Sequence, residues 1–90
     1  MNMLEELKRR GYSTKVCGTW YLKTAAELTR EAGRPLMMTK EVYPAIARMM
    51  QTTPVAIERS MRTSIGKAEP GRTNAEVVRE LALGMESHED

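Results

Sequence analysis

The chain has 90 residues, a length that fits one domain with a modest hydrophobic core and leaves little room for a deep enclosed active site. Hydrophobic residues make up 41% and charged residues 29%, so we expect a globular domain and not a disordered chain. The net charge is +2, and three of the twelve acids lie in the last five residues, so the rest of the chain is basic enough for a nucleic-acid partner.

Residues 1–90 are interpreted as a single domain that begins with a helix within residues 1–10. Asn2 can cap this helix, Glu5 stands at the capping-box position, and Gly11 ends it. The sequence has no apolar run long enough for a transmembrane helix and no signal peptide, so we expect a cytoplasmic protein.

A long second helix is predicted over residues 14–31, with Ser13 as its cap. Its apolar residues recur at helical spacing and are predicted to face the core: Val16, Cys17, Trp20, Tyr21, Leu28 and Ala32. Cys17 is interpreted as a buried structural thiol, because no histidine or other base is placed beside it. Gly18 is predicted to allow another helix to pack closely.

A third helix is predicted to begin after Thr39 and to end near Met50. Its apolar side is expected to consist of Val42, Ile46, Met49 and Met50. Pro44 removes a backbone hydrogen-bond donor, so we expect it to lie close to the first turn of this helix.

The fourth helix, over residues 54–68, has the clearest start signal of the chain. Thr53 is predicted as its cap, and Pro54 occupies the first helical position, where proline is preferred. Three apolar residues spaced four apart form one narrow stripe that can pack on the core: Ile57, Met61 and Ile65.

A fifth helix is predicted to open with the capping box that runs from Thr73 to Glu76. Its apolar face is predicted from Val77, Val78, Leu81 and Met85. Residues 86–90 are expected to be a frayed tail that contains the only histidine, His88. Since no run alternates with the period of a strand, the predicted fold is all-α, a compact bundle of about five helices that contains a helix-turn-helix.

The surface of the fourth helix suggests a function. Its outward positions are small, hydroxylated or charged, namely Ala56, Glu58, Arg59, Ser60, Arg62, Thr63 and Lys67. Arginine can bind guanine O6 and N7 with two hydrogen bonds, and glutamate can accept from cytosine N4. Serine and threonine hydroxyls can reach phosphates, and small residues let the backbone approach DNA. The alternative is a solvated surface on which Glu58 and Arg62, four apart, form an ordinary ion pair.

Two further residues are candidates for a phosphate contact. Thr39 and Lys40 stand at the predicted start of the third helix, where backbone N–H groups can hold a phosphate; the alternative is an ordinary helix cap. We find no catalytic constellation, no cluster of metal ligands and no Gly-rich phosphate loop, so we expect neither an enzyme nor a metal site nor a cofactor.

Four stretches of the chain resemble a known family, in the same order along the sequence: GTWYLKTA, TKEVYPAIARMMQTT, IERSMRTSI and TNAEVV. The family is the C-terminal effector domain of the master response regulator of sporulation initiation in endospore-forming bacteria. The resemblance covers most of residues 11–83. It implies an all-helical transcription regulator that reads a short double-stranded DNA box with its recognition helix, here about residues 54–68.

The resemblance also implies site residues. Glu58, Arg59 and Arg62 match family positions that read bases or contact the DNA backbone. This chain departs from the family at Ala56, where the relative has a basic residue, and at Thr63, where the relative has a histidine. Only residues 66–72 connect the recognition helix to the last helix, where the family has a longer insert with an extra helix.

The receiver domain that usually precedes this effector domain is also missing from the 90 residues. These departures leave two assemblies open, a homodimer or tandem arrangement on DNA and a complex with a protein partner. They also leave open a second function, a protein-interaction module that modulates a full-length regulator without binding DNA itself.

Overall fold

The computed structural model describes residues 2–87 of the chain. Within this range the protein is all-α, which confirms the predicted fold class. The elements in chain order are α1 (Met3–Arg9), α2 (Cys17–Ala32), the π-helical segment η1 (Met38–Val42), α3 (Tyr43–Met50), α4 (Pro54–Ala68) and α5 (Asn74–Ser87). None of these helices is long and apolar enough to cross a membrane.

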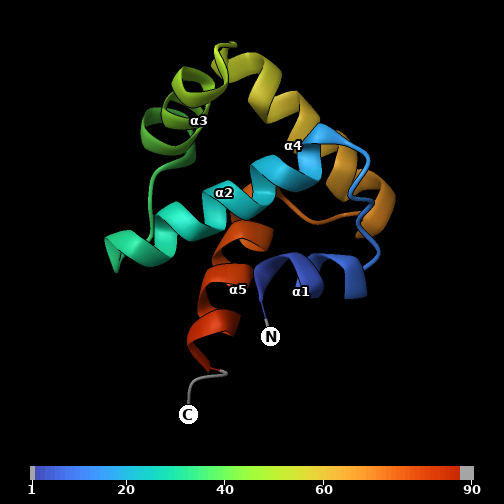
Figure 1. The fold of residues 1–90 in the computed structure, drawn as a ribbon. Helices are drawn as coiled ribbons and strands as arrows, with labels where there is room; N and C mark the ends of the chain where they lie inside the picture. The colour runs from blue at the N-terminus through green and yellow to red at the C-terminus, as the bar shows by residue number, and fades with distance from the viewer. Residues whose placement is uncertain (1, 88–90) are drawn as a thin grey trace.

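Helix α2 crosses the middle of the molecule (Figure 1). In this view α3 and the turn that follows it lie above α2, whereas the start of α1 and the end of α5 lie below it. Helix α2 packs on both α4 and α5, and α3 packs on α4. The core between the helices is formed by fully buried side chains from every α-helix, including Leu7, Leu22, Ile46, Ile57, Met61, Ile65, Val77 and Leu81.

Helix α2 starts later than the sequence predicted. Its first residue is Cys17, and Val16 occupies the cap position without a side-chain hydrogen bond. The prediction of Ser13 as the cap is therefore wrong. Ser13 instead lies in the preceding turn, where its carbonyl accepts a 2.6 Å hydrogen bond from the buried hydroxyl of Thr19.

The face that α2 buries also differs from the prediction. The buried residues are mostly small, namely Gly18, Thr19, Leu22, Ala25, Ala26 and Thr29. Cys17 is exposed, so its interpretation as a buried thiol is wrong. Trp20 is 41% exposed, and its indole N–H donates to the carbonyl of Thr14 at 2.9 Å. Helix α2 therefore packs mainly through small residues, together with Leu22, and these let its backbone come close to its neighbours.

The π-helical turn before α3 follows from Pro44. Proline has no N–H, and its ring would clash with the carbonyl four residues earlier in a regular α-helix. The chain avoids this by widening, so the N–H groups of Val42 and Tyr43 donate five residues back, to the carbonyls of Met37 and Met38. Pro44 then falls in the first turn of α3, as predicted.

The α5 capping box is confirmed, since Glu76 N–H donates to Thr73 Oγ1 at 3.2 Å and Thr73 N–H donates to Glu76 Oε1 at 2.8 Å. Helix α5 includes Ser87 and so overlaps the tail predicted at residues 86–90. The last residues, 88–90, with His88, lie outside the described range, as does the side chain of Met85.

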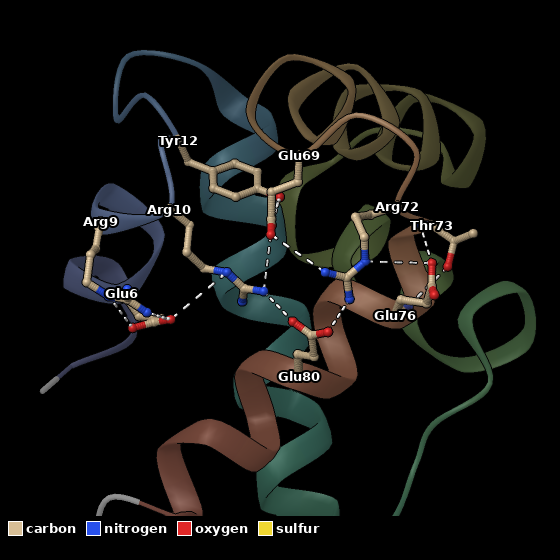
Figure 2. Close-up of polar contacts among 9 residues, drawn as sticks. All are labelled: Glu6, Arg9, Arg10, Tyr12, Glu69, Arg72, Thr73, Glu76 and Glu80. Atoms are coloured by element: carbon tan, nitrogen blue, oxygen red, sulfur yellow. Dashed lines mark hydrogen bonds and ion pairs between the residues drawn. The ribbon is translucent and has the colours of Figure 1, made fainter.

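A cluster of ion pairs holds α1 and the α4–α5 connector against α5 (Figure 2). Glu80 of α5 pairs with both Arg10 and Arg72. Glu69 lies 3.2 Å from Arg10 and 3.7 Å from Arg72, and it accepts a 2.7 Å hydrogen bond from the hydroxyl of the buried Tyr12. Figure 2 shows that the two guanidinium groups lie between the two carboxylates. Burial and the neighbouring Glu69 raise the pKa of Tyr12.

This cluster makes the free energy of unfolding depend on pH. Hydrogen bonds from Arg72 and Arg10 lower the pKa of Glu80 below its ordinary value of 4.5, so the folded state binds fewer protons than the unfolded chain around that pH. The stabilisation is present above about pH 4.5 and is lost as the pH falls through the lowered pKa. We expect Glu80→Gln to lower the urea midpoint at pH 7 and to flatten its decline toward pH 3.

The matched control for this prediction is Glu31→Gln, which removes an exposed carboxylate near the end of α2. It should leave both the midpoint and the pH profile close to those of the wild type. An unchanged slope in Glu80→Gln would mean that other carboxylates account for the acid sensitivity.

Candidate nucleic-acid interface

A tight turn joins α3 to α4. Gln51 adopts the left-handed conformation, with φ 54° and ψ 49°, a region that residues other than glycine rarely occupy. The N–H of Thr52 donates to the carbonyl of Ala47 at 2.9 Å and closes the end of α3. The chain thus changes direction within Gln51 and Thr52, as the predicted helix-turn-helix requires.

The start of α4 is set by local sequence. Thr53 has extended backbone angles, and its hydroxyl accepts a hydrogen bond from the N–H of Ala56 at 3.2 Å. Pro54 occupies the first turn, where its missing N–H costs nothing. Both predictions for this helix start are confirmed.

The inner side of α4 is anchored to three other helices. Ile57, Met61 and Ile65 are all buried, as their spacing predicted. Asn74, a buried residue that the sequence did not single out, adds a polar anchor. Its side-chain amide donates to the hydroxyl of Tyr43 at 2.9 Å and to the carbonyl of Glu58 at 3.3 Å. The orientation of α4 is therefore fixed against both α3 and α5.

The outer side of α4 carries the predicted DNA-contacting residues. Arg59, Arg62, Thr63 and Lys67 are exposed, and Ala56, Glu58 and Ser60 are half-buried. Arg62 Nε lies 3.6 Å from Glu58 Oε2, so these two residues form the expected ion pair in the protein without DNA. Arg59 forms no ion pair or hydrogen bond with the residues that the structure describes, and its guanidinium is available to a ligand.

A hollow of about 270 Å³ runs along one flank of α4, next to the start of α2. Its lining combines two cations with hydroxyl groups and small residues, namely Val16, Gly18, Arg59, Ser60, Thr63, Ser64 and Lys67. No carboxylate lies in this lining. The hollow thus brings four of the predicted residues together with the first turn of α2, which sequence reasoning had not placed there.

Thr39 and Lys40 do not join this group. They are exposed and belong to η1, which directly precedes α3. They therefore lie at the N-terminal end of α3, whereas the turn lies at its C-terminal end. Because η1 begins at Met38, Thr39 is not a helix cap, contrary to the alternative interpretation. The cap position of η1 is Met37, which makes no side-chain cap hydrogen bond. Glu41 accepts hydrogen bonds from Arg34 at 2.8 Å and from Met37 N–H at 2.7 Å, and these lower the pKa of Glu41 to about 2.

Three apolar side chains are exposed where α3 meets α4. Met49 and Met50 were predicted on the inner side of the third helix, but they are 58% and 44% exposed, and that prediction is wrong. Val55, in the first turn of α4, is 58% exposed. The sequence had pointed to the polar residues of this surface and had missed its apolar end.

No group of three or more potential metal ligands occurs among the described residues. The second helix of this helix-turn-helix, α4, has an anchored inner side and an exposed basic outer side. This arrangement is typical of the class of proteins that bind DNA through a helix-turn-helix. A family model described as "Sporulation initiation factor Spo0A C terminal" matches residues 3–89, so the chain belongs to this family of DNA-binding effector domains. A search among curated proteins found no match.

Proposed function

We propose that this chain acts as a single domain that binds double-stranded DNA with sequence preference, places α4 in the major groove and regulates transcription in the bacterial cytoplasm. The observation that carries the proposal is the guanidinium of Arg59, which has no ion-pair or hydrogen-bond partner among the described residues. It lies on the outer side of a helix whose inner side is fixed by Asn74 and the core. A helix that is held in a fixed orientation can place an arginine at a base edge, where its guanidinium can form two hydrogen bonds with guanine.

Each residue of the outer side has a role in this proposal. Arg59 and Arg62 bind guanine edges or phosphates, and Glu58 accepts from cytosine while it orients Arg62 across their 3.6 Å ion pair. Ala56 is small enough for the helix backbone to approach the groove. Thr63 binds a phosphate oxygen or a base edge through its hydroxyl.

The flanking hollow is suited to the DNA backbone. A phosphate group that entered it would meet the cation of Lys67 and the hydroxyl of Ser60, and the described residues of the lining include no carboxylate that would repel it. Thr39 and Lys40, at the far end of the helix-turn-helix, would contact a different phosphate. These contacts supply affinity and register, whereas the bases read by α4 supply the preference.

The test is fluorescence anisotropy with a short duplex that carries the sporulation regulator's box and with a scrambled duplex, over a salt series. We expect tighter binding to the box and a preference that survives added salt, because phosphate contacts are salt-sensitive and base contacts much less so. Equal and steeply salt-dependent binding to both duplexes would contradict sequence preference. No binding at low salt would leave the protein-interaction module as the function.

A further inference from the structure

The first turn of α4 carries an exposed apolar side chain, Val55. Val55 is the second residue of α4 and is 58% exposed. With 3.6 residues per turn, Arg59 and Arg62 follow four and seven positions later, so the three side chains lie in one row. That row is opposite the buried Ile57 and Met61.

The position of Val55 matters because the N-terminal residues of a recognition helix come closest to the base edges. A β-branched side chain in a helix is held in essentially one rotamer, so its two methyl groups keep a fixed place. Valine has no hydrogen-bonding group, and the one apolar feature that a base pair shows in the major groove is the C5-methyl group of thymine.

We propose that Val55 reads a thymine methyl group and so sets the sequence preference at one position that the arginines do not read. This inference rests on the proposed function, since it needs α4 in the major groove. Val55 would add preference without adding charge, so its effect would not depend on salt.

The experiment replaces each thymine of the box, one at a time on either strand, by uracil, which lacks only the methyl group. Anisotropy is measured with the wild type and with Val55→Ala. At one position we expect uracil to weaken wild-type binding about fourfold, the effect of losing one buried methyl-sized group. Val55→Ala should weaken binding to the unmodified box by a similar factor. Uracil at that position should then cause no further loss of affinity in this variant.

Leu83→Ala is the matched control, because Leu83 is an equally exposed apolar residue, at 62%, on α5. It should respond to every duplex as the wild type does. If the wild type prefers the box over a scrambled duplex but no uracil position is coupled to Val55, this inference is overturned and the proposed function stands. If the wild type shows no preference at all, both are overturned.

Discussion

Gly18→Ala is expected to lower the free energy of unfolding by about 2–3 kcal/mol, although alanine favours a helix more than glycine does. A Cβ atom at this position would lie 2.9 Å from the Cβ of Ser64 and still closer to the Ser64 hydroxyl and the backbone carbonyl of Ser60. Two of these atoms cannot rotate away, because they belong to the frame of α4. Helix α2 and helix α4 would therefore have to separate.

The measurement is urea unfolding followed by circular dichroism, with Gly84→Ala as the matched control. An added Cβ at Gly84, in α5, meets nothing within 4 Å, so this change should stabilise the protein by about 0.5 kcal/mol. Box affinity of the folded Gly18→Ala protein should also fall, since α4 is displaced. Stabilisation of both variants alike would show that Gly18 does not set the spacing of the two helices.

Arg59→Ala is expected to weaken binding to the preferred duplex by about 1–3 kcal/mol and to leave the stability of the fold unchanged. The reason is that Arg59 is exposed and has no partner among the described residues, so its loss breaks nothing in the free protein. Anisotropy with the box and the scrambled duplex measures the effect. The loss should be much larger on the box, because a base-reading arginine contributes mainly to preference.

Arg79→Ala serves as the control for charge, because it removes an exposed arginine from α5. It should weaken binding to both duplexes slightly and equally, because it changes only the net charge. If Arg59→Ala behaved in the same way, Arg59 would be a general electrostatic contact, and base reading would have to be assigned elsewhere on α4.

The parts of the fold that local sequence determines were predictable. The start of α4 follows from Thr53 and Pro54, whose capping and φ preference act within one helical turn. The capping box at Thr73 and the stripe at Ile57 and Met61 follow from spacing alone. The outer side of α4 could be assigned for the same reason, since a buried stripe fixes the opposite surface.

The parts that depend on tertiary contacts were not predictable. Helix α2 has apolar residues on several sides, and hydrophobicity favoured Trp20 and Cys17, whereas the structure buries the small residues that let α4 approach. Asn74 gives no signal in the sequence, because its two partners are 31 and 16 residues away. The hollow beside α4 likewise depends on the first turn of α2, a segment remote in the chain.

The placement of the start of α1 and the end of α5 has a practical consequence for experiments. The start of α1 and the end of α5 lie on the opposite side of α2 from the α3–α4 turn (Figure 1). A fluorophore attached at either end is thus held apart from the N-terminal end of α4, where the closest approach to DNA is proposed.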